Sequence, residues 1–396
     1  MPLKPNAPWR RALQSPHRFF SQSSSTTSQP LVTPTLNDNE RRRRRNDTRL
    51  STGIPVTGAI RQRLGLYAEL SKARLSALVV VTAGAGYAAG CDTMDPSTLA
   101  ALCAGTSLAA GSANTFNQVI ERNRDKSMKR TRARPLPAGR MDVQEAIGWG
   151  IFSAGSSCAL LAAGTNPITT GLGAANIALY ALPYTLSKPR TEMNTWIGAV
   201  VGAVPPIMGW CAAGGELLSP VPALLGTTLF LWQFPHFFSL AWIHRKDYAR
   251  GGHQMVPVND PTGKRTSDLV RNYSMYLLPL PILAAVSGET SYMFAIEGLA
   301  ATGYLIHLAE EFRRERSNDN ARRVFKCSLW YLPLVLALFA FHRRRDSKDD
   351  GEESLVKQLK NQLRNACVHD LIVSPQGAAL CPKTEAVNKT KQSLEK

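Results

Sequence analysis

The cysteines of this sequence lack any paired spacing, and that absence excludes two kinds of scaffold. The chain has 396 residues and seven cysteines, none of them in a Cys-x-x-Cys pair. Zinc sites and disulfide frameworks need clustered cysteines, so neither is supported. Most of the seven are expected to be small residues in a buried core.

The N-terminal stretch lacks acidic residues and a long apolar run. Its first acid is Asp38, whereas Arg10, Arg11 and Arg18 precede it and Ser and Thr crowd residues 21–28. This composition predicts a mitochondrial presequence and not a secretory signal, which would need an apolar core. An ordinary disordered tail is the alternative. We assign residues 1–63 to a presequence and a basic linker.

Lysines and arginines are not spread along the chain as a nucleic-acid-binding domain would spread them. The formal net charge is +18, yet the bases occupy alternate gaps between apolar runs. That alternation is typical of a polytopic membrane protein, whose basic loops share one side of the bilayer. The sequence therefore predicts an all-α bundle in a lipid bilayer and no nucleic-acid partner.

Nine apolar runs are candidates for transmembrane helices. They are residues 75–90, 98–120, 143–163, 167–186, 194–213, 218–243, 272–287, 291–308 and 324–341. Several are shorter than the ~20 residues that an average bilayer requires. The gaps after the odd-numbered runs contain no Lys or Arg, whereas the gaps after the even-numbered runs are basic. A transmembrane domain over residues 64–342 is predicted, with its N-terminus and basic loops in the matrix of a mitochondrion.

The C-terminal part of the chain departs from this alternation of basic and uncharged gaps. Arginines at 343–345 break the charge rule on the far side, where an interfacial anchor is the one role that we can suggest. Residues 343–396 are otherwise read as a polar tail without chemistry.

Three oxygen-bearing side chains lie at helical spacing across the end of the second apolar run. Asn117, Glu121 and Asp125 fall at i, i+4 and i+8, so one helix face presents all three. Basic residues come directly after them: Lys126, Lys129, Arg130, Arg132 and Arg134. Carboxylates beside cations suit a magnesium diphosphate, because Mg²⁺ prefers one or two carboxylates together with phosphate oxygens. A solvated helix end with surface ion pairs is the alternative. We call these three residues the first polar site.

The second half of the chain repeats that outline. Asp247 and Arg250 follow the sixth apolar run and form the second polar site. His236 lies inside that run, where an ionisable side chain is a candidate for function and, equally, for a hydrogen bond between helices. Between the two sites lies Lys188, and the pair Pro205-Pro206 is expected to break the fifth run and open a cavity.

The ordered motifs make a specific pattern. They are Asn117-x-x-x-Glu121-x-x-x-Asp125, Met128-Lys-Arg-Thr131, Arg134-Pro-Leu136, Tyr184-Thr, Asn194-Thr-Trp-x-Gly-Ala199, Gly202-Ala-x-Pro-Pro206, Gly209-Trp, Trp232-Gln-x-Pro-His236-Phe and Asp247-Tyr-x-x-Gly-Gly252. From residue 70 to about 255 this order resembles the protoheme IX farnesyltransferases, or heme O synthases, a branch of the UbiA-type intramembrane prenyltransferases.

The resemblance implies a nine-helix bundle with a central cavity and Mg²⁺ as cofactor. It implies transfer of farnesyl from farnesyl diphosphate to a vinyl group of heme B, with addition of water, to give heme O for heme A and cytochrome oxidase. Heme A synthase and other oxidase assembly factors are the implied protein partners. Carried over by position, the catalytic residues would be Asn117, Glu121, Asp125 and Asp247, with Glu121, Asp125 and Asp247 on the metal. The substrate-binding residues would be Lys72, Arg132, Lys188, Arg250 and His236.

Two positions depart from the pattern of the wider superfamily. Ile243 stands where many relatives carry an acid, and Pro189 stands where a second base is expected after Lys188.

Three other functions stay open at this point. A prenyltransferase for a quinone precursor would not be expected to need His236. A mitochondrial anion carrier would leave the acids of the first polar site without a role. A structural subunit of a respiratory complex would explain neither polar site.

Overall fold

The computed structural model describes residues 56–344, and the chain divides into two units, residues 1–64 and 65–396. The presequence-like stretch, Arg345 and the rest of the tail lie outside the described residues, so the domain boundaries given above stay predictions. Helix α2 (Val56–Leu70) runs across the division between the units. Within the described residues the secondary structure is helical, apart from one isolated bridge between Thr290 and Arg343.

The first half of the bundle is built from long helices with polar caps. After α2 come α3 (Ala73–Gly90), α4 (Pro96–Ser127), α5 (Val143–Gly164), α6 (Pro167–Leu179), the π-helix η1 (Tyr180–Tyr184), α7 (Thr185–Ser187) and α8 (Asn194–Ala212). Asp95 caps α4 by accepting hydrogen bonds from Ser97 and Thr98, and the Asp142 side chain caps α5 in the same way. Such caps satisfy the free N–H groups of the first turn and fix where each helix begins.

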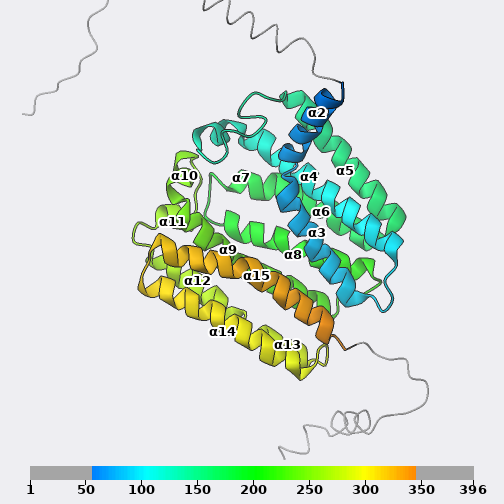
Figure 1. Cartoon of the computed structure of the whole chain (residues 1–396), viewed down its shortest axis with the longest axis vertical. Helices are drawn as coiled ribbons and strands as arrows, with labels where there is room; N and C mark the ends of the chain where they lie inside the picture. The colour runs from blue at the N-terminus through cyan, green and yellow to red at the C-terminus, as the bar shows by residue number, and fades with distance from the viewer. Residues whose placement is uncertain (1–55, 345–396) are drawn as a thin grey trace, which may run out of the picture. The chain divides into compact units, whose positions relative to one another are not determined.

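The second half has more, shorter elements. They are α9 (Pro220–Ile243), α10 (Arg245–Arg250), α11 (Val256–Asn259), α12 (Lys264–Tyr276), α13 (Pro279–Val286), α14 (Tyr292–Arg314) and α15 (Asn318–His342). In Figure 1, α8 and α9 cross the middle, with α3, α4 and α5 to one side and α12, α14 and α15 to the other. Helix α15 packs against both α9 and α3, so the last helix of the bundle meets its first membrane helix.

Two glycines allow α3 and α8 to approach at the level of the backbone. A Cβ atom on Gly86 would lie 2.0 Å from the carbonyl oxygen of Pro206, and one on Gly209 would lie 1.9 Å from that of Ala83. Neither position can hold a side chain without separating the two helices. The Gly202 to Trp210 motif of α8 therefore includes a residue that sets helix packing.

Each of the nine predicted apolar runs falls largely on helix in the structure, although a turn at Leu277 and Leu278 divides the run over residues 272–287. Five described helical segments are long and apolar enough to cross a membrane: Ala73–Gly90, Val143–Gly164, Asn194–Ala212, Lys264–Val286 and Asn318–His342. The other four runs correspond to α4, α6, α9 and α14, which fall short of the same threshold of length, hydropathy or charge. The prediction of an all-α membrane bundle is thus confirmed, and the loop-charge pattern remains the argument for nine crossings.

The proline pair of α8 does not break its helix, contrary to the sequence-based expectation. Pro205 and Pro206 lie inside one continuous helix, because a proline φ is compatible with α-helix even though each ring removes an N–H donor. The irregular stretch lies instead at η1, which contains Pro183. A π-turn inside a helix changes the direction of the side chains that follow it, and such turns are frequent at functional sites.

Arg343 has a structural role on the far side of the bundle. Its guanidinium donates to the carbonyl oxygen of Ala89 at 2.7 Å, pairs with Glu289 at 2.6 Å and lies 4.8 Å from the ring centroid of Trp210. The arginine therefore ties the end of α15 to the ends of α3 and α8. We refer to this contact as the Arg343 clasp.

Candidate active site

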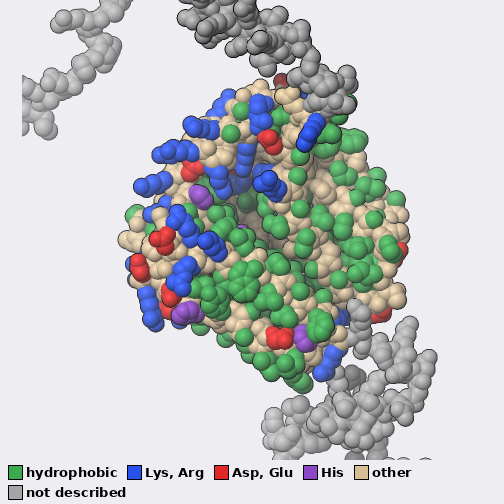
Figure 2. Space-filling view, in the orientation of Figure 1, with side chains coloured by type: hydrophobic (Ala, Val, Ile, Leu, Met, Phe, Trp, Pro, Cys, Tyr) green, Lys and Arg blue, Asp and Glu red, His purple; other side chains and the backbone are tan. Residues whose placement is uncertain are grey.

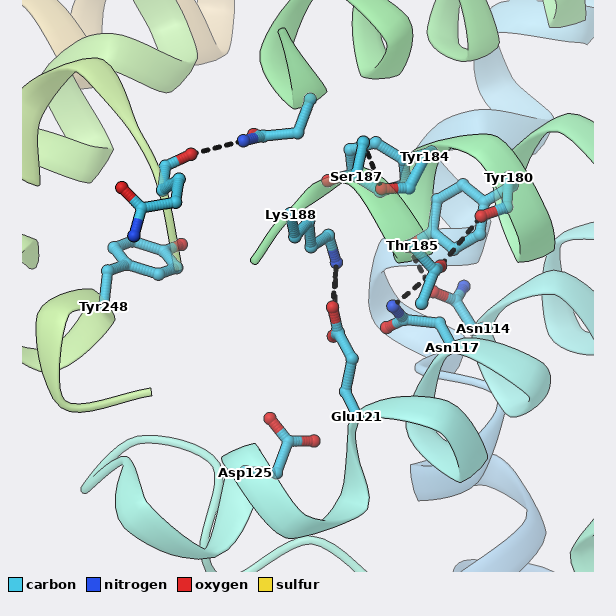
Figure 3. A network of polar contacts seen from close by, with 12 residues as sticks. Asn114, Asn117, Glu121, Asp125, Tyr180, Tyr184, Thr185, Ser187, Lys188 and Tyr248 are labelled. Carbon is cyan, nitrogen blue, oxygen red and sulfur yellow. Dashed lines mark hydrogen bonds and ion pairs between the residues drawn. The ribbon is translucent and has the colours of Figure 1, made fainter. Parts of the chain in front are cut away.

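Helix α4 presents the first polar site toward the interior of the bundle. Asn117, Glu121 and Asp125 have exposed fractions of 1%, 4% and 2%, as expected for three residues on one face of a packed helix. Figure 3 shows Glu121 and Asp125 projecting from the same side of α4, with Tyr248 across from them. Buried carboxylates of this kind need partners, because an unpaired charge in a low-dielectric interior is costly.

Lys188 is the partner of Glu121. Its ammonium lies 3.0 Å from one carboxylate oxygen, Oε1, and donates a hydrogen bond of 3.2 Å to the other, Oε2. The same ammonium lies 4.5 Å from the ring centroid of Tyr184. Burial opposes the charged form of Lys188, but the attraction of Glu121 outweighs it and holds the pKa of Lys188 above its ordinary value. Lys188 follows α7 directly. Its position is therefore set by the irregular helical segment, η1 and α7, that ends the fourth apolar run.

Arg134 is the partner of Asp125. One guanidinium nitrogen lies 2.8 Å from Oδ2 of Asp125, and the Thr131 hydroxyl donates to the backbone carbonyl of Asp125 at 3.0 Å. The basic loop after α4 therefore folds back over the carboxylates that precede it. Sequence reasoning included Arg134 among the following bases without assigning it to the site.

Lys72 is the partner of Asn117. Its ammonium donates to Oδ1 of Asn117 at 3.1 Å, and Nδ2 of Asn117 donates to the Thr185 hydroxyl at 3.1 Å. Lys72 has a φ of 47°, in the left-handed region that a lysine rarely adopts, and it forms the turn between α2 and α3. Burial, together with the positive charges of Arg134 and Lys188, lowers the pKa of Lys72 to about 7.

The π-helix η1 supplies a second layer of hydrogen bonds. Tyr180 donates to Oδ1 of Asn114 at 3.1 Å, and the Thr185 hydroxyl donates to the carbonyl of Tyr180 at 2.8 Å. These residues fix Asn117 in turn, as Figure 3 shows. Sequence reasoning missed Asn114 and Tyr180. The one available signal was Pro183, a helix-disturbing residue inside an otherwise regular apolar run.

The second polar site has a different geometry. Asp247 on α10 accepts hydrogen bonds from the backbone N–H groups of Lys129 at 2.8 Å and Arg130 at 3.2 Å, one on each carboxylate oxygen. Burial would raise the pKa of Asp247, but these two hydrogen bonds outweigh it and hold that pKa below its ordinary value. Arg250 is half-exposed and lies 3.9 Å away. Asp247 thus joins α10 to the basic loop that follows α4.

The two remaining predicted contacts lie in contrasting surroundings. His236 on α9 shares a hydrogen bond of 2.9 Å with the Ser328 hydroxyl of α15 through Nδ1, and its ring stacks on Trp232 with centroids 4.7 Å apart. The hydrogen bond between helices that the sequence suggested as one role for His236 is therefore present. It uses one of the two ring nitrogens. Arg132 is exposed on the basic loop.

His253 is a buried residue that sequence reasoning treated as an ordinary loop histidine. It has an exposed fraction of 4%, and among the described residues its Nδ1 atom finds no hydrogen-bond partner. Burial lowers the pKa of His253, and the negative charge of Glu121 offsets part of that effect. No feature of the sequence around Gly251 and Gly252 distinguishes this histidine from an exposed one.

The donor atoms of the first polar site fit a metal that shares its coordination with a substrate. Within residues 56–344, no three His, Cys, Asp or Glu side chains are grouped closely enough to hold a metal by themselves. Glu121 and Asp125 lie one helical turn apart, and the buried Oε1 of Glu121 contacts the Lys188 ammonium at 3.0 Å without a further hydrogen bond to any described residue. Two carboxylates with spare lone pairs suit Mg²⁺, which completes its shell with phosphate oxygens and water.

The described part of the molecule has a hollow on one face. Figure 2 shows this hollow, with Lys and Arg side chains along one margin and hydrophobic side chains over the surface on the other. A ligand with an anionic head and an apolar body would match both margins.

Comparison with known proteins identifies the fold family. The UbiA prenyltransferase family model matches residues 77–332. The chain belongs to this family. The match begins within α3 and ends within α15, so it contains both polar sites and the bundle between them.

Individual relatives agree with the family model. The mitochondrial protoheme IX farnesyltransferase of Arabidopsis thaliana is 39% identical over 365 residues, which cover 89% of this chain and 84% of the relative. The human protein of the same name is 41% identical over 287 residues, covering 72% of this chain and 64% of the relative. A solved UbiA homologue from Archaeoglobus fulgidus bound to DMAPP and Mg²⁺ matches with a TM-score of 0.56 at 14% identity, covering 69% of this chain and 99% of that one. At that identity the likeness shows the fold alone.

Proposed function

We propose that this chain is a protoheme IX farnesyltransferase. It breaks the bond between C1 of the farnesyl group and the diphosphate oxygen, which keeps the electron pair, and joins C1 to a vinyl carbon of heme B. The cationic carbon left next to the porphyrin ring takes up water and releases a proton, giving heme O. The names of the relatives favour this reaction over transfer to a quinone precursor.

One structural observation supports the proposal most directly. Each polar side chain of the first polar site is already paired with a cationic one: Asn117 with Lys72, Glu121 with Lys188, and Asp125 with Arg134. The side chains of the site are therefore nearly charge-balanced among themselves. A magnesium diphosphate bound here would be held by the two carboxylates on the metal and by the three cations on the phosphate oxygens. Little net charge is buried in this arrangement, which lowers the cost of binding a highly charged head inside a membrane protein.

The cations also act on the reaction itself. Negative charge grows on the bridging oxygen as the bond to C1 breaks, and Lys188 and Arg134 stand beside the carboxylates where that oxygen would lie. Fixed positive groups that need no reorganisation stabilise such charge strongly. A Mg²⁺ ion bound to Glu121 and Asp125 would supply further neutralisation of the diphosphate as a Lewis acid. Asn117 orients Lys72 by the hydrogen bond to Oδ1.

The second polar site positions the loop that carries Arg134. Both oxygens of Asp247 accept backbone hydrogen bonds from Lys129 and Arg130. Those bonds favour a positioning role over direct metal ligation, although each oxygen retains a lone pair. A loop held at its start by α10 keeps Arg134 over Asp125.

Heme B would bind with its ring toward the apolar part of the hollow. We assign this contact to the stacked aromatic pair Trp232 and His236 on α9, in which Nε2 is the ring nitrogen of His236 that Ser328 does not contact. The propionates need cations in contact with water, and Arg132 and Arg250 are the exposed bases near the two polar sites that we assign to them.

The proposed location is the mitochondrial inner membrane, with the basic loops and both polar sites on the matrix side. The loop charges support this orientation, and the relatives are mitochondrial enzymes. Heme A synthase or another oxidase assembly factor would be the natural acceptor of the product, because heme O is too apolar to cross the matrix freely.

A reconstituted assay tests the proposal. Membranes containing the full chain receive heme B, farnesyl diphosphate and Mg²⁺, and the hemes are extracted and separated. Heme O is expected from the wild type, and none when EDTA replaces Mg²⁺. Asp125→Asn removes the charge of one ligand and serves as the variant. Product formed equally by the wild type and by this variant would contradict the assigned site, whereas a farnesylated quinone precursor without heme O would contradict the assigned substrate.

A further inference from the structure

A second cavity lies between α3, α4 and α5, apart from the carboxylates of the first polar site. Its volume is about 170 Å³. Hydroxyl groups dominate its polar lining, and its walls include Ser71, Ser76, Ala77, Ser107, Trp149 and Ser153. Neither the farnesyl group nor heme B is assigned to this space by the reaction proposed above.

The cavity is open at its rim and polar at its floor. Ala77 and Ser107 are exposed, whereas Ser153 is fully buried. Among the described residues the Ser153 hydroxyl finds no hydrogen-bond partner. An unpaired buried hydroxyl is unfavourable, so a ligand that accepts its hydrogen bond would recover that free energy. The floor therefore favours a ligand with an acceptor oxygen.

The depth of the cavity matches the polar boundary of a bilayer. Ser76 is the fourth residue of α3 and Trp149 the seventh of α5, and both helices begin on the side that carries the polar sites. At 1.5 Å per residue these positions lie roughly 5–10 Å from the helix starts. The Trp149 indole N–H donates to the Ser71 hydroxyl at 3.1 Å, and its ring lies 4.7 Å from that of Tyr67. Aromatic pairs of this kind mark the level where ester groups and headgroups meet the hydrocarbon.

We propose that this cavity binds the glycerol ester region of one phospholipid molecule. The hydroxyl of Ser153 donates to an ester carbonyl, which is an acceptor without a donor of its own. The acyl chains continue over the exposed side chains of Leu78 and Phe152, which are the sequence neighbours of the lining residues Ala77 and Ser153. Arg74, exposed one residue after the start of α3, lies at the headgroup end and favours an anionic phosphate.

The bound lipid would support the turn that carries Lys72. The carbonyl of Ser71 accepts hydrogen bonds from the Ser76 hydroxyl at 2.9 Å and from Asn114 at 3.4 Å. Ser71 thus lines the lipid cavity while its neighbour Lys72, in its left-handed conformation, contacts Asn117 in the active site. The proposed lipid site and the first polar site thus use adjacent residues, Ser71 and Lys72.

The test measures bound lipid and does not depend on farnesyl transfer. The full chain is delipidated in detergent and mixed with either dioleoyl phosphatidylglycerol or its diether analogue, which has no ester carbonyls. Native mass spectrometry then counts the molecules retained. The wild type is expected to retain one diester molecule with about fivefold preference over the diether, the value of one hydrogen bond.

Three variants separate the cavity from the general lipid surface. Ala77→Phe fills the cavity from its exposed rim and is expected to lose the retained molecule. Ser153→Ala keeps the space and is expected to bind diester and diether equally. Gly155→Phe adds the same bulk on α5 at a site with nothing within 4 Å, and it is expected to behave as the wild type. Equal binding of both lipids by the wild type, or full retention by Ala77→Phe, would overturn the proposal.

Discussion

The two polar sites look alike in the sequence and differ in the structure. Each follows an apolar helix with an acid and then a base. At the first site the carboxylates are buried and paired with side-chain cations, Glu121 with Lys188 and Asp125 with Arg134. At the second, Asp247 is bound by backbone N–H groups and its neighbouring base, Arg250, is half-exposed.

This difference indicates that the two polar sites have different roles. Side-chain cations can rotate from a carboxylate to a phosphate, so the first site can exchange its partners when a ligand enters. Backbone N–H groups are fixed by the fold, so the partners of Asp247 cannot leave without moving the loop. The first site is suited to binding and the second to holding the binding loop in place. The predictions that follow test this contrast.

The largest effect is expected for Asp125→Asn. Loss of one metal-binding charge should lower the rate of heme O formation at least about 100-fold, since mutation of groups that orient a metal already costs 10- to 100-fold. The rate is measured at saturating heme B and farnesyl diphosphate, with the thermal midpoint as a control for folding. A folded variant that keeps a third of the activity would contradict the role of this site.

Glu121→Gln should change both activity and stability. The substitution leaves the Lys188 ammonium buried without a counter-charge, at a cost of about 3 kcal/mol in the free energy of unfolding. The double variant Glu121→Gln with Lys188→Met removes that charge as well, so it should regain most of the stability and none of the activity. Recovery of both properties would show that the pair serves packing alone.

Asp247→Asn distinguishes positioning from ligation. If Asp247 holds the loop, the rate should fall about tenfold while the Mg²⁺ concentration for half-maximal activity stays unchanged. Asp125→Asn supplies the contrast, because any residual activity there should need more Mg²⁺. A rise in the Mg²⁺ requirement of Asp247→Asn would place this residue on the metal and remove the distinction between the two sites.

Lys72 gives the first polar site a pH dependence. Burial lowers the pKa of Lys72 to about 7, so this ammonium is charged below pH 7 and loses its charge as the pH rises through that value. The KM for farnesyl diphosphate should therefore rise about fivefold between pH 6 and pH 8. Lys72→Arg keeps its charge over this range and should remove that rise. Ionisation of the substrate is common to both proteins, so the ratio of their KM values isolates the lysine.

Arg250→Ala should have the smallest effect. Arg250 is half-exposed and lies 3.9 Å from Asp247, so the free energy of unfolding should change by less than about 0.5 kcal/mol. Loss of a propionate contact should raise the KM for heme B about threefold and leave the KM for farnesyl diphosphate unchanged. A raised KM for farnesyl diphosphate with an unchanged KM for heme B would assign Arg250 to the diphosphate.

Helical periodicity was sufficient to align the first polar site. The spacing of Asn117, Glu121 and Asp125 places them on one face of any regular helix, and α4 is regular over that stretch. Spacing cannot show which cation meets which acid, because Lys188 and Arg134 reach α4 through loops whose course depends on tertiary packing. The pairing of Glu121 with Lys188 joins residues 67 positions apart.

Prolines were the least reliable guides. Pro205 and Pro206 were expected to break a helix and did not, whereas the irregular turn occurred at Pro183. Proline alone does not decide the outcome, because neighbouring helices can satisfy the freed carbonyl groups. Asn114 and Tyr180 were not predicted as site residues, because the π-turn that brings them together leaves no periodic pattern in the sequence.

The Arg343 clasp bears on the order in which the bundle can be completed. Arg343 follows every described helix along the chain, yet its guanidinium contacts the carbonyl of Ala89 at the end of the first membrane helix. During synthesis this carbonyl, which lies in the last turn of α3, has to bond to water or another partner until the ribosome has produced all the other helices. The contact of the end of α15 with the ends of α3 and α8 is thus a final step of biogenesis. A polypeptide that stops short of residue 343 cannot form the Arg343 clasp.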